Sequence, residues 1–261
     1  MSLLRNISWR TISVWKRDRD VFFTTWKTNF LPPFLEPILY LIAMGFGFGV
    51  MIGTISYKGD MISYAKFLAP GLVAISIMYG AFFECTYGSF VRMHYQKTFD
   101  AMIATPLSIE EVISAEILWG ATKSFINGSI VLLVIFAFGL VSFPGFIFVP
   151  IIALLGGLAF ASLAMIFTAL VPNIDSFNYP FFLLITPMFL FSGTFFPLSI
   201  LPEWGQTVAM ALPLTEVTML TRDLCFSVPD WSSVFAILYL VVFTAILFYA
   251  AVWMMKRRLI K

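Results

Sequence analysis

The sequence predicts an all-α polytopic membrane protein with six transmembrane helices. Of its 261 residues, 60% are hydrophobic and 11% are charged, and the mean hydropathy is +0.94. Soluble domains carry roughly 25% charged residues. The apolar residues form stretches suited to crossing a bilayer, which takes about 20 helical residues. We expect the spans at residues 30–53, 65–91, 108–141, 146–171, 178–193 and 233–255, within one transmembrane domain covering 1–261.

Residues 1–28 predict an amphipathic helix in the membrane interface. One face of it is mostly apolar, because Leu4, Ile7, Thr11, Val14/Trp15, Phe22 and Trp26 recur at helical spacing. Its basic residues are Arg5, Arg10, Lys16, Arg17, Arg19 and Lys27. Such a helix lies flat at a membrane surface. The segment lacks the continuous apolar core of a signal peptide; the alternative is a basic tail that only orients the first span.

Three prolines crowd the start of the first span, at Pro32, Pro33 and Pro37, so we expect that start to be bent. A short polar loop, 54–64, leads to the second span. In that span Glu84 and Tyr87 fall on one helical face, and Glu84 lies about 12 Å from Arg92 at 1.5 Å per residue. A carboxylate this deep should face protein or water.

A polar island, Arg92–Glu116, separates the second and third spans. Pro106 disfavours helix at Thr105 and should end a short helix at 98–105. Ser108 is expected to cap the next helix, with acidic residues in its first turn. The short helix is well placed to receive force from a soluble partner; the alternative is an ordinary charged loop. The contact residues would be Thr98, Phe99, Asp100, Ala101, Met102, Ile103, Ala104, Thr105 and Pro106.

The third span carries a polar stripe on its island half, because Glu116, Lys123 and Asn127 recur at helical spacing. We hypothesise that this stripe, with Glu84 and Tyr87, lines a vestibule open to the island side, and that Lys123 pairs with Glu84. The alternative is a structural polar contact between neighbouring helices that never touches substrate.

Residues 194–230, between the fifth and sixth spans, are too apolar for an ordinary loop, and prolines interrupt them too often for a full span. Two short helices that dip back into the membrane fit best, and backbone at that depth needs protein or a cavity beside it. They would form an external gate; the alternative is a hairpin that caps the bundle without gating. The expected gate residues are Phe195, Phe196, Pro197, Leu198, Pro202, Trp204 and Pro213.

Positive charge gathers on one side of the predicted topology. The N-terminal segment, the island start and the C-terminal tail contribute six, two and four basic residues, whereas the opposite side holds only Lys58, Lys66 and Arg222. The positive-inside rule therefore places both termini and the island in the cytoplasm. Cys85 and Cys225 fall at different depths, so no disulfide is expected.

The residues disfavour catalysis within this chain. His94 is the only histidine, so neither a metal site nor a hydrolytic constellation is expected. An ion-coupled secondary transporter would need intramembrane ion sites and often an internal repeat. Glu84 alone does not supply them.

The order of these parts resembles the permease subunit of type-2 ABC exporters, over essentially the whole chain. The resemblance is carried by Phe67-Leu-Ala-Pro-Gly-Leu72, Lys97-Thr-Phe-Asp-Ala-Met-Ile-Ala-Thr-Pro-Leu107, Phe191-Ser-Gly-Thr-Phe-Phe-Pro-Leu198 and Leu212-Pro-Leu214. Tyr87-Gly-Ser-Phe-Val-Arg-Met93 and Thr98-Phe-Asp-Ala-Met102 resemble most the nodulation-factor (lipo-chitooligosaccharide) exporter branch. Many members have Gly-Thr where Lys97-Thr98 stands here.

The resemblance implies a cytosolic coupling helix at 98–105, two permease copies forming the pore, and two separate ATPase subunits that bind ATP and Mg. The chain itself has no Walker-type loop. The implied substrate is an amphiphile, such as a lipid-linked oligosaccharide or polysaccharide, and the implied place is the bacterial inner membrane. Nucleic acid is not an implied partner. The alternatives are an exporter of hydrophobic drugs or lipids and an ion-coupled transporter.

Overall fold

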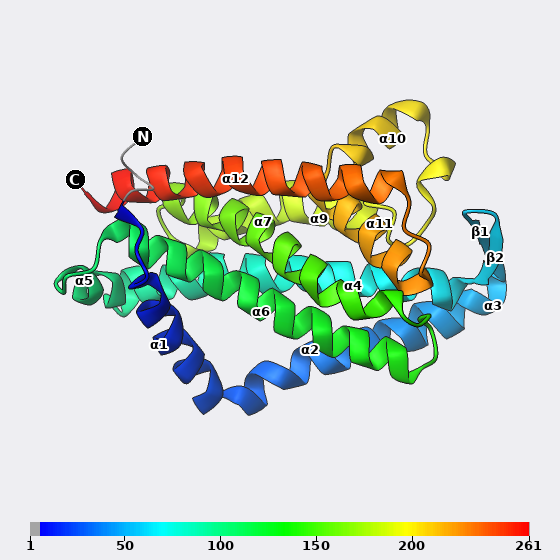
Figure 1. Cartoon of the computed structure of the whole chain (residues 1–261), viewed down its shortest axis with the longest axis horizontal. Coiled ribbons are helices and arrows are strands. Elements are labelled where there is room, and N and C mark those ends of the chain that lie inside the picture. Colours follow the sequence, from blue (N-terminus) through cyan, green and yellow to red (C-terminus); the bar gives the residue numbers. More distant parts are fainter. Residues whose placement is uncertain (1–5, 261) are drawn as a thin grey trace.

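The computed structural model describes residues 6–260 as a bundle of long, roughly aligned helices (Figure 1). Among these described residues, six helical segments are long and apolar enough to cross a membrane: 31–52, 64–95, 109–137, 145–170, 174–191 and 231–259. The prediction of six spans is thereby confirmed. The two ends of the described chain and α5 lie at one end of the bundle, and the β1–β2 hairpin and α10 lie at the other (Figure 1).

The N-terminal region is two helices joined at an angle, α1 (Thr11–Thr24) and α2 (Trp26–Tyr40). Leu4 and Arg5 of the predicted helix lie outside the described residues, and Ile7 precedes α1, which begins only at Thr11. All three prolines sit inside α2, and the break between the two helices lies before them, at Thr25. The span then continues through η2 (Leu41–Phe48), a π-helical stretch, and α3 (Gly49–Ile52).

Residues 54–64, predicted as a loop, instead contain an antiparallel hairpin of β1 (Thr54–Tyr57) and β2 (Asp60–Ser63). The two turn residues, Lys58 and Gly59, both have positive φ, at 49° and 95°. Two successive positive φ values are the hallmark of the tight turn that matches the twist of paired strands. The sequence offered no alternation strong enough to reveal it.

The centre of the bundle is α4 (Tyr64–Phe83), which packs against both α6 (Ile109–Ala137) and α7 (Val149–Leu170), and those two helices also pack on each other. The second span continues past its predicted end at Val91, through η3 (Glu84–Gly88) and η4 (Val91–Tyr95). Ser108 caps α6 as predicted. Its Oγ accepts from the amide of Glu111 at 3.2 Å, while its own amide donates to the Glu111 carboxylate at 2.7 Å.

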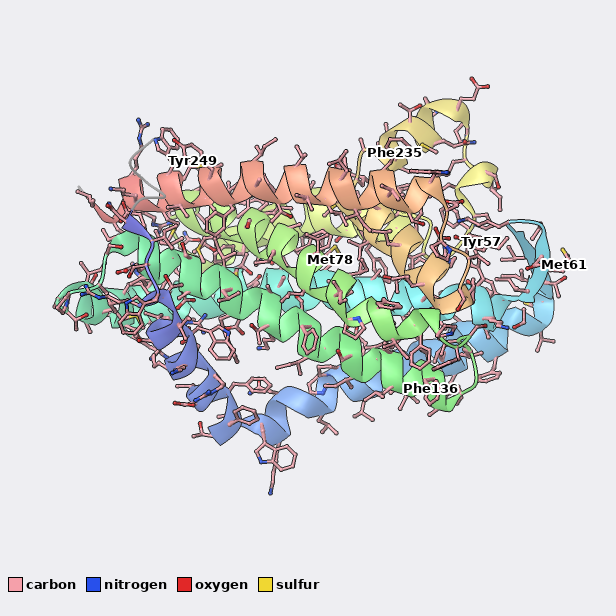
Figure 2. The ribbon with its side chains drawn as sticks, in the orientation of Figure 1. Tyr57, Met61, Met78, Phe136, Phe235 and Tyr249 are labelled. Atoms are coloured by element: carbon pink, nitrogen blue, oxygen red, sulfur yellow. The ribbon has the colours of Figure 1, made fainter. Side chains whose placement is uncertain are left out.

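The fourth and fifth spans follow α6 in the chain and are built from several short helical segments and one long helix. η5 (Gly145–Phe148) precedes α7, and η6 (Ile174–Phe177), α8 (Asn178–Pro180), η7 (Phe181–Ile185) and α9 (Thr186–Phe191) form the fifth span. Figure 2 shows Met78 inside the bundle, whereas Phe136 and Phe235 point outward. Large apolar side chains that point away from the core suit a lipid environment.

The region predicted to dip back into the membrane contains η8 (Leu198–Ile200), α10 (Glu203–Met210) and α11 (Pro213–Phe226), before α12 (Trp231–Leu259). α11 begins with Pro213, whose fixed φ suits the first turn of a helix. It packs against α4, α7 and α12 and is largely buried. α10 projects from the end of the bundle instead (Figure 1), so the two helices are not equivalent.

Candidate functional site

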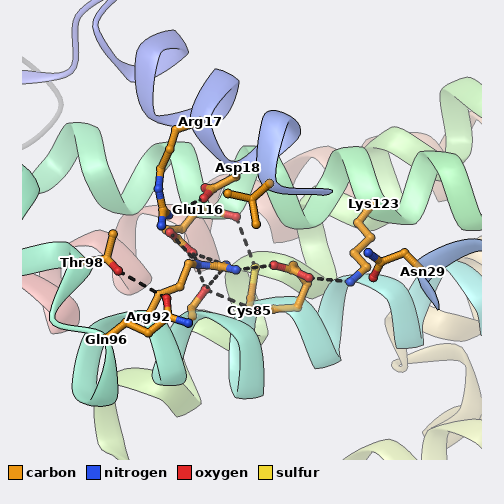
Figure 3. Close-up of polar contacts among 12 residues, drawn as sticks. Arg17, Asp18, Asn29, Cys85, Arg92, Gln96, Thr98, Glu116 and Lys123 are labelled. Carbon is orange, nitrogen blue, oxygen red and sulfur yellow. Dashed lines mark hydrogen bonds and ion pairs between the residues drawn. The ribbon is translucent and has the colours of Figure 1, made fainter. Parts of the chain in front are cut away.

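A buried ion network connects the second and third spans near the α5 end (Figure 3). The Arg92 guanidinium donates to both Glu116 oxygens, at 2.5 and 3.1 Å, and to a Glu84 oxygen at 2.7 Å. Ser89 adds a hydroxyl hydrogen bond to Glu116 at 2.6 Å. The fork of one arginine therefore joins two carboxylates from two helices, a geometry that a lysine cannot reproduce.

The other Glu84 oxygen accepts from Lys123 Nζ at 2.7 Å. The predicted Glu84–Lys123 ion pair is thus confirmed. Sequence reasoning missed Arg92 as the second partner of Glu84, although the two residues lie about two helical turns apart. The ionic groups form one chain, in the order Glu116, Arg92, Glu84 and Lys123.

α1 brings a further carboxylate, Asp18, to this network. Asp18 is 3% exposed, and only one of its oxygens is bonded, by Arg17 at 2.8 Å; the other is buried without a partner. Burial, followed by the charge of Glu116, raises the pKa of Asp18 to about 7. Sequence reasoning missed Asp18. It lies four residues after Val14 and four before Phe22, so it falls on the same face of the predicted helix as these two residues.

The buried face of α1 explains how Asp18 reaches the network. Trp15 Nε1 donates to Thr122 Oγ1 at 2.9 Å, and Trp119 of α6 packs edge to face against both Trp15 and Phe22. The predicted interface helix therefore lies against α6 along one face. Its opposite face keeps apolar side chains such as Phe23 exposed.

Two polar cavities of about 420 and 520 Å³ lie beside the network. Glu84 and Tyr87 line the smaller one, Asn127 lines the larger one, and Lys123 lines both. Four of the five predicted vestibule residues are thus brought together. Glu116 is the exception: it is fully buried behind Arg92 and lines neither cavity.

The larger cavity is walled by aromatic rings that sequence reasoning did not select. Tyr79 stacks with Phe189 at 6.0 Å and packs near Phe83 and Phe181, which also line the cavity. The polar lining residues that sequence reasoning missed are Asn29, Glu36, Tyr40 and Ser76. They come from α2 and α4, and no short motif in the sequence joins these helices. The wall combines flat apolar faces with hydrogen-bonding groups.

The predicted coupling segment contains α5 (Thr98–Ile103) and a turn that ends at Pro106. Phe99 is fully buried and anchors the helix, while Asp100 and Ala101 are exposed. Lys97, at the N-cap, has a left-handed backbone with φ 55°. This conformation favours glycine, which gives a physical reason why many members of the family that the sequence resembles carry Gly here.

Residues near both ends of the described chain contact the region where α5 ends and α6 begins. Arg10 donates to the Pro106 carbonyl at 2.7 Å, and Ser8 hydrogen-bonds Glu111. Lys256, near the end of α12, pairs with Glu110 at 2.5 Å. The two ends of the described chain thus bind the segment that links α5 to α6 and the first turn of α6.

The seven predicted gate residues do not form one cluster. Phe195 packs on Phe189 at 5.0 Å and Pro213 is buried, but Trp204 on α10 is 73% exposed. Sequence reasoning missed Arg222, which stacks on the Phe67 ring at 3.9 Å. The remaining predicted residues, Phe196, Pro197, Leu198 and Pro202, lie in the connection between α9 and α10.

Within residues 6–260 no group of three or more His, Cys, Asp or Glu side chains could hold a metal ion. Cys85 and Cys225 are both free and buried. His94 is exposed and stacks on Phe90. The candidate site in the described chain therefore consists of ion pairs, hydrogen-bonding groups and aromatic rings.

Comparison with known proteins gives a consistent family match. Residues 10–226 match the family described as ABC-2 type transporter. "Nodulation protein J" of Sinorhizobium fredii is 36% identical over 97% of this chain and 95% of its own length. The Rhizobium meliloti protein of the same name is 37% identical over 85% and 83%. The Escherichia coli "Inner membrane transport permease YadH" is 24% identical over 94% of both chains.

Proposed function

This chain belongs to the ABC-2 type transporter family, and from that membership we propose that it is the permease subunit of an ATP-driven exporter. It would form the translocation path for an amphiphilic substrate, such as a lipid-linked oligosaccharide or polysaccharide. ATP and Mg would be bound by two copies of a separate ATPase subunit. A second permease copy would complete the pore.

The observation that carries this proposal is the pair of polar cavities that adjoin the ion network at the α5 end. Cavities lined by charged, amide and hydroxyl groups can replace water around the polar part of a substrate. Their aromatic walls, with Tyr79 and Phe83 among them, offer flat apolar faces to the ring carbons of a sugar. A mixed lining of this kind suits an amphiphilic glycan better than a purely apolar drug.

The ion network supports a mechanical role for α5. η4, which carries Arg92, leads into α5, and α6, which carries Glu116, follows it. A buried, bidentate ion pair holds its two partners in one geometry because separating them exposes uncompensated charge. A push on α5 would therefore move the second and third spans together. The cavities between those spans and α2 would change shape as a result.

The orientation in the proposal follows from the charges at the two ends of the bundle. The end with α5 carries the basic residues Arg10, Lys97, Lys256, Arg257 and Arg258, whereas those at the opposite end are Lys58, Lys66 and Arg222. By the positive-inside rule, α5 and both termini face the cytoplasm. The location in the proposal is the bacterial inner membrane.

Helix disruption in α5 tests the proposal. The amide of Ala101 donates to the Lys97 carbonyl at 3.1 Å, and the Ala101 side chain is exposed. Ala101→Pro removes this bond and places a proline ring against the preceding turn, at a cost of about 3 kcal/mol. Ala101→Ser at the same position is the matched control.

We expect Ala101→Pro to insert normally into membranes but to lose co-purification with an ATPase subunit and to stop substrate export. Ala101→Ser should retain both. Unchanged export by the proline variant would refute α5 as the coupling element. Transport driven by an ion gradient, with this chain alone in vesicles, would refute the exporter itself.

A further inference from the structure

The larger polar cavity contains a carboxylate that the protein leaves without a partner. Glu36 lies in the first span (31–52) and lines this cavity of about 520 Å³. In the part of the chain that the structure describes, its side chain makes no hydrogen bond and no ion pair. Acidic residues inside spans are rare and normally have a partner, so an acid without one indicates a site for a ligand.

Other unused hydrogen-bonding groups surround Glu36. Tyr40 follows it at a spacing of four residues and therefore lies on the same face of α2. Ser76 and Tyr79 of α4 line the same cavity, and so does Asn127 of α6. Within residues 6–260 the side chains of these four residues have no hydrogen-bond partner either. All of them except Asn127 also line an adjoining recess together with Glu36, so they lie close together.

Glu36 adds a negative charge that no described residue in the cavity lining balances. Lys123 is the other charged residue of that lining, and its ammonium group is already bonded to Glu84 at 2.7 Å. Arg92 bonds both Glu84 and Glu116, so these four residues balance one another in charge. An ionised carboxylate only accepts hydrogen bonds. The ligand that best complements this cavity therefore carries a positively charged donor.

Aromatic rings beside the cavity favour an organic cation. Tyr40 and Tyr79 both pack near Phe189, with ring centres 6.5 and 6.0 Å from it. Phe83 and Phe181 line the cavity as well. The faces of such rings attract ammonium groups. A metal ion would need several oxygen ligands, and within residues 6–260 no group of three or more His, Cys, Asp or Glu side chains could supply them.

We infer that Glu36 binds an ammonium group on the glycan of the transported amphiphile, so that the substrate carries a free amino group. The inference rests on the proposed function and adds the charge of the substrate's polar part. Ser76 and Asn127 would hydrogen-bond the neighbouring sugar hydroxyls. A lipid headgroup with an ammonium group fits less well, because its phosphate would need a cation and Lys123 is already bonded to Glu84.

Binding measurements with two matched probes test the inference. Octyl glucosaminide and octyl glucoside differ only in whether one ring carbon carries an ammonium or a hydroxyl group. The dissociation constant of each probe is measured by isothermal titration calorimetry in phosphatidylcholine nanodiscs, at a pH where the amine is protonated. Empty nanodiscs report the partition of each probe into lipid.

Wild type should bind the amino probe about 10- to 100-fold more tightly than the glucoside, the usual effect of a hydrogen bond to a charged group. Glu36→Gln should bring this ratio close to one. Glu203→Gln is the matched control, because Glu203 on α10 is also exposed, lines neither polar cavity and loses the same charge. Ser76→Lys leaves Glu36 in place but gives it a counter-ion from within the cavity, so it should also remove the preference.

Equal binding of the two probes by wild type would overturn the inference, and so would a preference that survives in Glu36→Gln or Ser76→Lys. Loss of the preference when phosphatidylethanolamine replaces phosphatidylcholine would assign the cavity to a lipid headgroup and overturn it as well. The nanodiscs contain neither ATP nor an ATPase subunit. Failure of the α5 test would therefore leave these results unchanged, and equal binding of the probes would leave export of neutral glycans untouched.

Discussion

Replacing Arg92 by methionine tests the ion network most directly. The substitution removes every hydrogen bond from the guanidinium to Glu116 and Glu84. Glu84 keeps Lys123, but Glu116 is fully buried and keeps only the hydroxyl of Ser89. Removing one partner of a buried pair costs about 3–5 kcal/mol because the other charge remains buried without compensation.

That cost corresponds to a large fall in melting temperature. For chains of 150–250 residues, 1 kcal/mol shifts the midpoint by about 2–4 °C, so we expect a fall of roughly 6–20 °C. The two buried free cysteines, Cys85 and Cys225, make the assay possible in the native sequence. A thiol-reactive dye becomes fluorescent as heating exposes them.

A double substitution separates the loss of the pair from a general packing defect. Arg92→Met with Glu116→Gln removes the orphaned charge and should recover most of the lost stability. Arg19→Met is the control, because the exposed Arg19–Asp20 pair should contribute less than about 1 kcal/mol. The reasoning fails if Arg92→Met melts like wild type, or if the double variant is no more stable than Arg92→Met.

The contacts of Glu84 decide which substitutions can test the Glu84–Lys123 pair. A charge swap would place a lysine at position 84 directly beside Arg92, since Glu84 contacts both cations. The swap would therefore fail even though the pair exists. Neutral substitutions at Lys123 avoid this conflict.

Three further predictions concern α1, the α5 cap and the external hairpin. Burial and the charge of Glu116 raise the pKa of Asp18 to about 7, so docking of α1 should weaken as the pH rises from about 4 to 7 and should stay weak above pH 7. Asp18→Asn should abolish this pH dependence. Equal amide exchange of α1 in the wild type at pH 6 and 8, after correction for intrinsic rates, would disprove the prediction. Lys97→Gly should raise stability by about 1 kcal/mol by relieving the left-handed backbone, whereas Lys97→Val should lower it, as thermal melts will show. Asp223 accepts from the Tyr57 hydroxyl at 2.6 Å and pairs with Lys58 at 2.8 Å. Lys58 keeps Asp230 when Asp223 is lost, so Asp223→Ala should cost about 1–3 kcal/mol, chiefly because the Tyr57 hydroxyl loses its acceptor. It should also accelerate amide exchange across 54–63, and unaltered exchange there would contradict the role of this carboxylate in holding the hairpin.

Much of the architecture followed from patterns that are local in the sequence. Six apolar stretches predicted six spans because a bilayer demands long runs of apolar side chains. Ser108 and Glu111 predicted the start of α6 because a capping box needs only residues three apart. Glu84 and Lys123 were paired because both fell on polar stripes of adjacent spans, and a charge at that depth requires a partner.

The tertiary structure alone decided which of these polar groups work together. Asp18 and Glu116 are about a hundred residues apart in sequence, and nothing local indicates that α1 would dock on α6 and bring them together. Glu116 was predicted to face a vestibule, but packing covers it with Arg92. Hydrophobic stretches and helix caps are local features, so the chain specifies them segment by segment. The ion network and the two polar cavities beside it depend on how whole helices rotate and pack, which the sequence pattern does not determine.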